Sequence, residues 1–192
     1  SRQEEKAINR RSHLEKITQV DDIWERLKVQ VGDVVAVNSP HTFHPESFTY
    51  KELAENISQA ANSFSQIGVE PDDVVALFAE NSPRWLIADQ GLMRIGASDS
   101  VRGATAPSSE LRYILEDSNA VGLIVQNSAV WERLSLNEDQ KNSLKFVVQL
   151  EGKACEGVLD WETFLQKGLN KENISKPEKI NESKQTKIAT IL

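Results

Sequence analysis

Apolar residues spaced three and four apart alternate along the chain with short continuous apolar runs. The first pattern predicts helices that bury one face, and the second predicts strands that are covered on both faces. The expected helices are 20–31, which Gly32 ends, 49–67, 82–96, 110–118, 128–134 and 160–169. The expected strands are 34–38, 74–79, 97–101, 121–126 and 146–150. Strands alternating with helices predict an α/β fold with a mainly parallel sheet and flanking helices.

Two of these helices carry clear start signals. Thr49 followed by Glu52 forms a capping box, in which each residue satisfies a backbone donor that the helix leaves unpaired. Ser82 is a plausible cap for the next helix, and Pro83 stands at the first helical position, where its missing N–H costs nothing. These signals fix the two helix starts more firmly than periodicity alone.

The two ends of the chain differ from its middle. Residues 1–18 are charge-dense and are expected to form a solvated arm, while residues 19–192 form the α/β domain. A polar connector, 170–185, precedes a final apolar run, 188–192, which we expect to re-enter the sheet as a strand. A chain that ends on a strand, without a polar tail, suggests an incomplete domain.

Composition excludes several classes of function. The 192 residues carry a formal net charge of -7, which disfavours a protein that binds nucleic acid through its phosphates. No run approaches the 18 to 20 apolar residues, roughly, of a transmembrane helix. Cys155 is the single cysteine, so it forms no intrachain disulfide and is read as structural or incidental in a reducing, intracellular compartment. Because the sequence begins at Ser1 and shows no leader pattern, we expect truncation there too.

Few residues are candidates for chemistry. His41 and His44 stand in an expected loop without a third metal ligand, and His13 lies in the charged arm, so no metal site is expected. Glycine-rich phosphate loops, nucleophile elbows and paired-cysteine motifs are absent from the sequence. We therefore assign no catalytic, cofactor-binding or metal-binding residue to this chain, and its substrate-binding residues remain unknown.

The remaining polar features have structural interpretations. The pairs Asp21–Asp22 and Asp72–Asp73 precede a helix and a strand, where helix-dipole and turn chemistry explain them. Sequons at Asn56, Asn173 and Asn181 are interpreted as chance matches, since the first lies within an expected helix.

Two further groups carry more specific alternatives. Trp85 and Asp89 lie one helical turn apart and are expected to pack in the core or beside it. Arg102 and Gly103 follow a short strand, and ligands of open α/β sheets bind at the carboxyl ends of strands. Arg102 can therefore hold a carboxylate or phosphate, or form a surface ion pair, and the sequence leaves both alternatives open.

The ordered series of motifs resembles the N-terminal part of the adenylate-forming, AMP-binding enzymes. It comprises FTYKEL, GVEPDDVVALFAENSPRW, the short strand after RIGA, SSELRYILEDS and VGLIV. The combination NSPRWLIADQG with VRGATAPSSEL most resembles the long-chain acyl-acyl-carrier-protein and acyl-CoA synthetases of plastids and cyanobacteria. The resemblance covers about 34–192, although the part after Leu150 matches only in position.

This resemblance implies an activity for the parent protein. A long-chain fatty acid would be activated with ATP and Mg²⁺ as an acyl-adenylate, then transferred to a phosphopantetheine thiol on acyl carrier protein or coenzyme A. In the family, a segment like KIATIL feeds a Ser/Thr/Gly-rich phosphate loop. The chain would then be truncated before that loop. Alone it would bind neither ATP nor Mg²⁺ tightly, and it would be inactive without the remainder of the synthetase.

The same resemblance leaves alternatives. Many members of the family have an apolar, proline-containing segment after the short strand, whereas SDSVRGATAP here is polar. This difference leaves the acyl length and the thiol acceptor undecided. Rival interpretations are an adenylation domain for another carboxylate, such as an aryl acid or amino acid, and a non-catalytic α/β binding or scaffold domain. A plastid location is implied by the resemblance alone.

Overall fold

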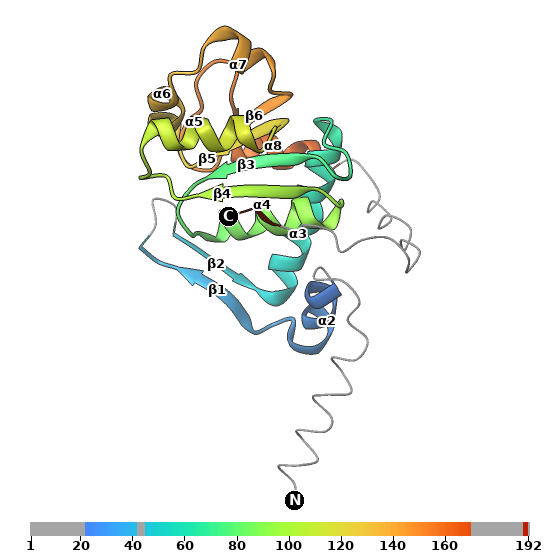
Figure 1. Ribbon diagram of the computed structural model, residues 1–192. Helices are drawn as coiled ribbons and strands as arrows, with labels where there is room; N and C mark the ends of the chain where they lie inside the picture. Colours follow the sequence, from blue (N-terminus) through green and yellow to red (C-terminus); the bar gives the residue numbers. More distant parts are fainter. Residues whose placement is uncertain (1–21, 42–44, 170–189, 192) are drawn as a thin grey trace, which may run out of the picture.

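The computed structural model describes residues 22–41, 45–169 and 190–191 (Figure 1). The charged arm 1–18 and the polar connector 170–185 lie outside these residues, so their predicted character and the domain boundaries stay predictions. None of the helices in the described part of the chain combines the length and the apolar character that crossing a membrane requires.

A single parallel sheet organises the described structure. Its strands follow the order β7-β6-β5-β3-β4-β8, and every neighbouring pair is parallel. The strands are β3 (Val74–Phe78), β4 (Ser98–Arg102), β5 (Gly122–Val125), β6 (Phe146–Gln149), β7 (Leu159–Asp160) and β8 (Thr190–Ile191). The predicted α/β class and mainly parallel sheet are therefore confirmed, and the predicted closing strand does enter the sheet, beside β4.

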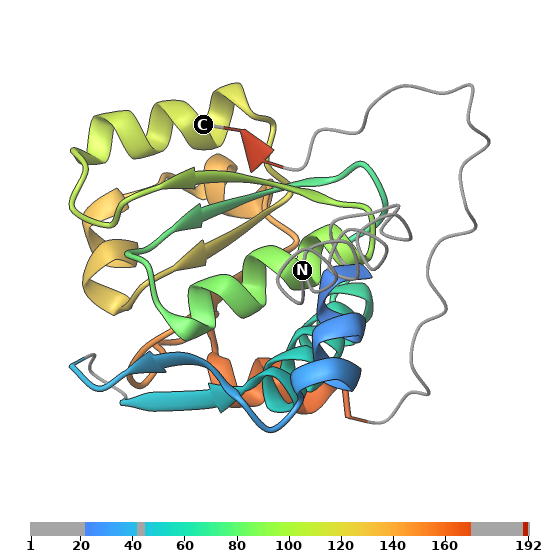
Figure 2. The ribbon, with the colours of Figure 1, turned by 90° about the horizontal axis from the view of Figure 1, so that it is seen from below.

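Helices cover both faces of this sheet, as Figure 2 shows from below. One face packs against α3 (Tyr50–Gln66), α4 (Pro83–Arg94) and α8 (Trp161–Lys167). The other packs against α5 (Ser108–Asp117) and α6 (Ser128–Leu134), and α7 (Glu138–Asn142) follows α6. Helices lie in the connections from β3 to β4, from β4 to β5 and from β5 to β6, which is why the sequence alternates its two patterns there. Residues 150–158 join β6 to β7 without a helix.

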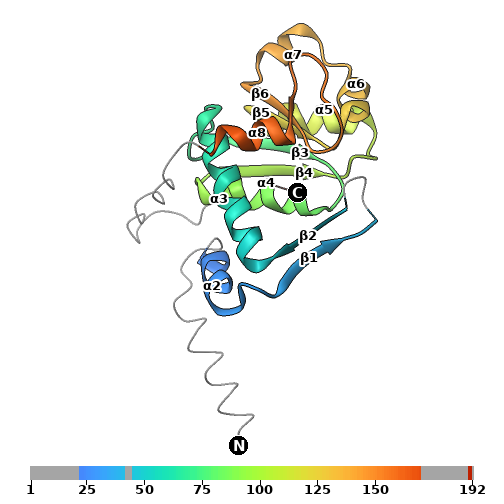
Figure 3. The same cartoon turned by 180° about the vertical axis from the view of Figure 1, so that it is seen from behind.

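A small antiparallel unit lies against the first helix layer. It consists of β1 (Val35–Ser39) and β2 (Glu46–Thr49), and it follows α2 (Asp22–Val31). Figure 3 shows the unit and α2 beside α3, on the side of the molecule away from α5 and α6. Ala36, Val37 and Phe48 pack against the core beneath α3 and α4, so the pair is anchored without joining the main sheet.

The central strand β3 divides the interior into two cores. Val75 and Leu77 face the core formed with α3, α4 and α8, whereas Ala76 and Phe78 face the core formed with α5 and α6. All four side chains are fully buried. Alternate side chains of a strand point to opposite faces, and the continuous apolar run of β3 serves both cores.

The structure adds elements that the hydrophobic pattern did not predict. The short β2, β7 and α7 were missed, and α5 begins at Ser108 rather than at residue 110. α7 carries its own capping box between Asn137 and Gln140, a signal present in the sequence but attached to only five helical residues. Asp160 caps α8 as expected.

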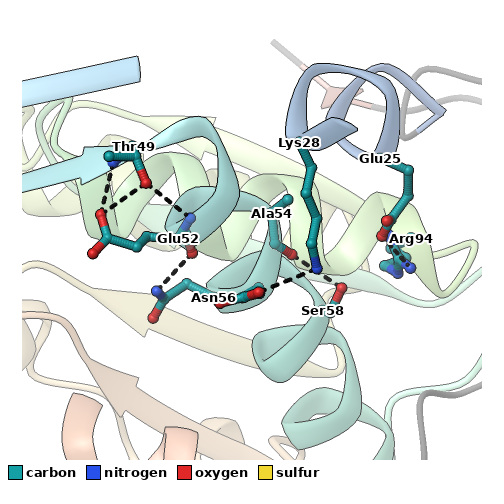
Figure 4. A network of polar contacts seen from close by, with 9 residues as sticks. Glu25, Lys28, Thr49, Glu52, Ala54, Asn56, Ser58 and Arg94 are labelled. Atoms are coloured by element: carbon teal, nitrogen blue, oxygen red, sulfur yellow. Dashed lines mark hydrogen bonds and ion pairs between the residues drawn. The ribbon is translucent and has the colours of Figure 1, made fainter. Parts of the chain in front are cut away.

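The predicted capping box of α3 is confirmed and appears in Figure 4. The Thr49 N–H donates to Glu52 Oε2 at 2.8 Å, and the Glu52 N–H donates to Thr49 Oγ1 at 3.3 Å. The Thr49 hydroxyl donates to the same carboxylate at 3.0 Å. The backbone and side-chain hydrogen bonds from Thr49 hold the pKa of Glu52 below its ordinary value of 4.5.

An aromatic contact joins α3 to the sheet and to α8. The Phe64 ring lies 4.7 Å from that of Phe164 and 6.2 Å from that of Phe146, measured between centroids. We predict that Phe64→Ala lowers the free energy of unfolding by about 3–5 kcal/mol, because a buried phenyl ring leaves a cavity. Urea denaturation of the chain measures this, with the exposed Tyr113→Ala as control, expected within about 0.5 kcal/mol of wild type. Equal losses for both variants would contradict this packing.

The capping box predicts a pH dependence with a defined sign. A carboxyl group whose pKa is lower in the folded state stabilises the protein above its unfolded pKa, and this contribution is lost as pH falls through the folded value. We expect NMR titration to give Glu52 a pKa below 4.5, and Thr49→Ala to move it back toward 4.5. Glu52→Gln should flatten the acid dependence of stability in this range, since glutamine caps without titrating. A wild-type Glu52 pKa at or above 4.5 would contradict the assignment.

Candidate functional site at the carboxyl edge of the sheet

The carboxyl ends of all the parallel strands meet at one edge of the sheet. At the centre of this edge, β3 is followed by Glu80, β4 ends at Arg102, and β5 is followed by Gln126. These polar residues appear where the apolar runs stop, because side chains beyond the strand ends leave the two cores. In open α/β sheets this edge is where ligands bind, so it is the candidate site.

Glu80 holds the loop that follows β4. Its Oε1 accepts from both the N–H and the hydroxyl of Thr105, each at 3.4 Å. Gly103 lies directly against the same carboxylate, since a Cβ placed there would be 3.1 Å from Glu80 Oε1. Any larger side chain at Gly103 would push this carboxylate away, so the glycine permits the close approach.

The opposite side of the same loop is held by Arg133 from α6. Its two terminal nitrogens donate to the carbonyls of Ala104 and Ala106, the second at 2.9 Å. Both alanines are buried, so these carbonyls need protein donors. Residues 103–107, which we call the β4–α5 loop, are thus fixed by a carboxylate on one side and a guanidinium on the other.

Gln126 continues the polar network across the edge toward β6. Its side-chain oxygen accepts from the backbone N–H of Glu80 at 3.2 Å, and its Nε2 donates to the Glu151 carboxylate at 3.3 Å. The network therefore connects the residues that follow β4, β3, β5 and β6. It gives the loops of this edge fixed positions without regular secondary structure.

Arg102 points from the end of β4 toward α5. Its Nε donates to Glu110 Oε1 at 2.6 Å, and 49% of its side chain is exposed. Of the two alternatives that the sequence left open for Arg102, the ion pair is present in the structure.

A buried arginine ties this edge to the rest of the molecule. Arg84, in the first turn of α4, pairs with Glu46 at 2.8 Å and with Glu162 at 2.9 Å, and donates to the Leu150 carbonyl at 2.6 Å. These partners come from β2, from α8 and from the residue that follows β6. Arg84 therefore supports the scaffold, and its nitrogens are occupied.

The other candidate residues of the sequence do not join this edge. His41 is exposed, His13 and His44 lie outside the described residues, and no group of potential metal ligands forms within the described part. Cys155 is exposed. Asp22 lies in the first turn of α2, as expected of a helix start, and Asp21 is outside the described residues.

The second acidic pair stabilises a turn, as predicted. Asp72 adopts a left-handed backbone conformation, with a φ of 71°. Asp73 accepts from the Glu70 N–H and pairs with Lys145, each at 2.9 Å. Asn56 lies within α3 as expected, and the sequons at Asn173 and Asn181 lie outside the described residues.

The structural interpretation of Trp85 and Asp89 is also confirmed. Trp85 packs against the core of the first helix layer, and Asp89 is buried. The Asp89 carboxylate accepts from Gln90 Nε2 at 2.6 Å, and Gln90 accepts from the Trp24 indole N–H at 2.5 Å. The hydrogen bond from Trp24 to Gln90 attaches α2 to α4, and Asp89 orients Gln90 within α4.

A hollow of about 360 Å³ lies between α2, α3 and the end of α8, away from this edge. Its lining is polar, and its cation Lys28 pairs with Glu55 at 3.2 Å. Figure 4 shows Lys28 beside the neighbouring pair of Glu25 with Arg94, whose atoms are 3.0 Å apart. Each charged side chain described in the lining therefore has an oppositely charged partner.

Glu80, Thr105 and Arg133 were not singled out from the sequence. Glu80 and Thr105 stand 25 residues apart, and Arg133 is a further 28 residues along the chain. Only the parallel pairing of β3 with β4 and the packing of α6 bring them together. The one signal available in the sequence was position, since Glu80 directly follows the predicted strand 74–79.

Comparison with known proteins identifies the fold family. A family model described as AMP-binding enzyme matches residues 24–192. The chain is 40% identical over 133 residues to the probable acyl-activating enzyme 16, chloroplastic, of Arabidopsis thaliana. It is 38% identical over the same length to the long-chain-fatty-acid–[acyl-carrier-protein] ligase AEE15, chloroplastic, of that plant. Each match covers 69% of this chain and 18% of the relative.

Structural similarity agrees with this match. The anthranilate CoA ligase AuaEII, solved in complex with anthranoyl-AMP, superposes with a TM-score of 0.70 at 22% identity. The superposition covers 77% of this chain and 28% of the ligase. At this identity the likeness establishes the fold alone, whereas the family match spans most of the sequence. The chain belongs to the AMP-binding, adenylate-forming enzymes.

Proposed function

We propose that this chain is the N-terminal part of an ATP-dependent ligase that activates long-chain fatty acids. The observation that carries the proposal is the 40% and 38% identity to two plant proteins named as an acyl-activating enzyme and as a fatty-acid ligase. The chain spans 18% of their length, so the activity belongs to the full-length protein that contains it. Both relatives are named chloroplastic, which supports a plastid location.

The proposed reaction has two steps. An oxygen of the fatty carboxylate attacks the α-phosphate of ATP, and pyrophosphate leaves to give an acyl-adenylate. The sulfur of a phosphopantetheine thiol then attacks the acyl carbon, AMP leaves, and a thioester forms on acyl carrier protein or coenzyme A. Mg²⁺ would offset the negative charge on the transferring phosphate.

The described residues supply a scaffold for this chemistry. Glu80, Glu110 and Glu151 at the edge each accept a hydrogen bond from a neighbour, so they anchor loops rather than act as free bases. Arg102 is a half-exposed cation at the carboxyl end of β4, and its chemistry fits a phosphate group. The single positive charge of Arg102 does not balance the negative charge of a triphosphate. The remaining donors must come from outside the described residues, and we expect the 192-residue chain alone to be inactive.

The rival interpretation as a scaffold domain makes a different prediction about the coding sequence. The proposed ligase requires a Ser/Thr/Gly-rich phosphate loop soon after Leu192, because backbone N–H groups of such a loop cradle nucleotide phosphates. A stop codon directly after Leu192 would favour the scaffold interpretation. Sequencing the transcript distinguishes them.

Pyrophosphate exchange tests the proposed reaction directly. The full-length protein should incorporate labelled pyrophosphate into ATP with long-chain fatty acids, and not with anthranilate or with amino acids. Mass spectrometry of acyl carrier protein and coenzyme A after incubation then identifies the acceptor. Exchange that depends on an aryl or amino acid would replace the proposal with another adenylation activity, and no exchange with any acid would contradict it.

A further inference from the structure

The pairing of β8 with β4 fixes where the chain leaves the sheet. Thr190 pairs with Asp99 and Ile191 pairs with Ser100, and the two strands run in the same direction. The carboxyl end of β8 therefore lies at the carboxyl edge, beside that of β4. Arg102 follows Ser100, the partner of Ile191, by two residues along β4. Arg102 thus stands beside the exit of β8.

The guanidinium of Arg102 is only partly engaged. Its Nε bonds to Glu110, but neither terminal nitrogen makes a hydrogen bond to another residue of the described part. The contrast with its neighbours is informative, since Arg84 uses all three of its nitrogens and Arg133 uses both terminal ones. A guanidinium with two free terminal nitrogens presents a fork of N–H donors that matches two oxygens of a phosphate.

The backbone that carries Arg102 is held in place. Arg102 is hydrogen-bonded within the sheet as the last residue of β4, and the next residues belong to the loop that Glu80 and Arg133 fix. Glu110 orients the side chain from α5, at 2.6 Å. A donor that is preorganised in this way loses little freedom when it binds an anion.

We propose that Arg102 binds a phosphate group of a substrate at the exit of β8, with Glu110 as the residue that positions its guanidinium. This inference rests on the proposed function, because it assumes that the full-length protein handles phosphate-bearing substrates at this edge. Two substrates carry the required chemistry, ATP and the phosphopantetheine arm of the acceptor. Carboxylates of Glu80 and Glu151 lie near the same edge, so the affinity depends on donors of the complete protein.

The test compares variants of the full-length protein by equilibrium binding as well as by activity. Calorimetry gives the Kd of ATP, and steady-state assays give the KM of ATP, of fatty acid and of the thiol acceptor. Arg102→Gln is the test variant, and Arg102→Lys keeps the charge but loses the fork. Lys141→Gln is the matched control, since Lys141 also forms an exposed ion pair, with Glu138 on α7, on the amino side of β6.

We expect Arg102→Gln to weaken the binding of one phosphate-bearing substrate about ten-fold or more, with the fatty-acid KM unchanged. Arg102→Lys should recover part of this binding. A raised Kd of ATP assigns the nucleotide phosphate, and a raised KM of the acceptor alone assigns the pantetheine phosphate. Lys141→Gln should change neither the Kd of ATP nor the KM of the acceptor. Circular-dichroism melting curves that match wild type show that the exposed substitutions leave the fold intact.

Two results would overturn the assignment. The first is an Arg102→Gln variant whose Kd of ATP, KM of ATP and KM of the thiol acceptor all stay within two-fold of wild type. The second is an equal effect of Lys141→Gln on these values. Failure of the proposed ligase function would give a different set of results from failure of the phosphate assignment. A wild-type protein that binds ATP through Arg102 but exchanges no pyrophosphate with any acid supports the phosphate assignment and contradicts the ligase, whereas one that binds neither phosphate ligand contradicts both.

Discussion

The burial of β3 on both faces is the constraint on which the rest of the structure depends. Its side chains alternate between two cores, so helices must cover the sheet on both sides, and the connections must cross from one strand end to the next strand start. All carboxyl ends then lie along one edge. The side chains of β3 itself are apolar, whereas the neighbouring β4 also buries Ser98, Asp99 and Ser100, and polar side chains organise the loops at the carboxyl edge.

The polar residues of the edge act on the backbone more than on one another. Glu80 and Arg133 hold the β4–α5 loop by its N–H and carbonyl groups, and Gln126 binds the backbone N–H of Glu80. Such contacts satisfy buried backbone groups where no strand or helix can do so. The result is a set of loops with fixed positions around the end of β4, next to the point at which β8 leaves the sheet.

Much of this fold could be predicted from local patterns, because local forces dominate those parts. The α3 capping box of Thr49 with Glu52 and the cap of α8 at Asp160 depend on residues three apart in the chain. The same holds for the apolar run of β3. The strand β2 could not be found in this way, since its four residues include one large apolar side chain, Phe48, and it is held by pairing with β1.

The candidate site was less predictable than the fold for a physical reason. Arg102 stood out because it followed an expected strand, but its partner Glu110 and the loop anchors are set by tertiary packing. Strand order, likewise, is decided by how helices cover the sheet, and the sequence carries no local signal for it. The family resemblance supplied the fold family but no strand order, because an ordered series of weak motifs is specific even where each motif alone is not.

The central claim is that the carboxyl edge around β3 and β4 is where the full-length protein handles its substrates. A crystal structure of that protein with a non-hydrolysable ATP analogue tests it most directly. The account predicts that the chain turns at this edge after β8 and that the nucleotide phosphates lie at the ends of β3 and β4. Phosphates bound at the amino edge of the sheet, or against the β1–β2 unit, would contradict it.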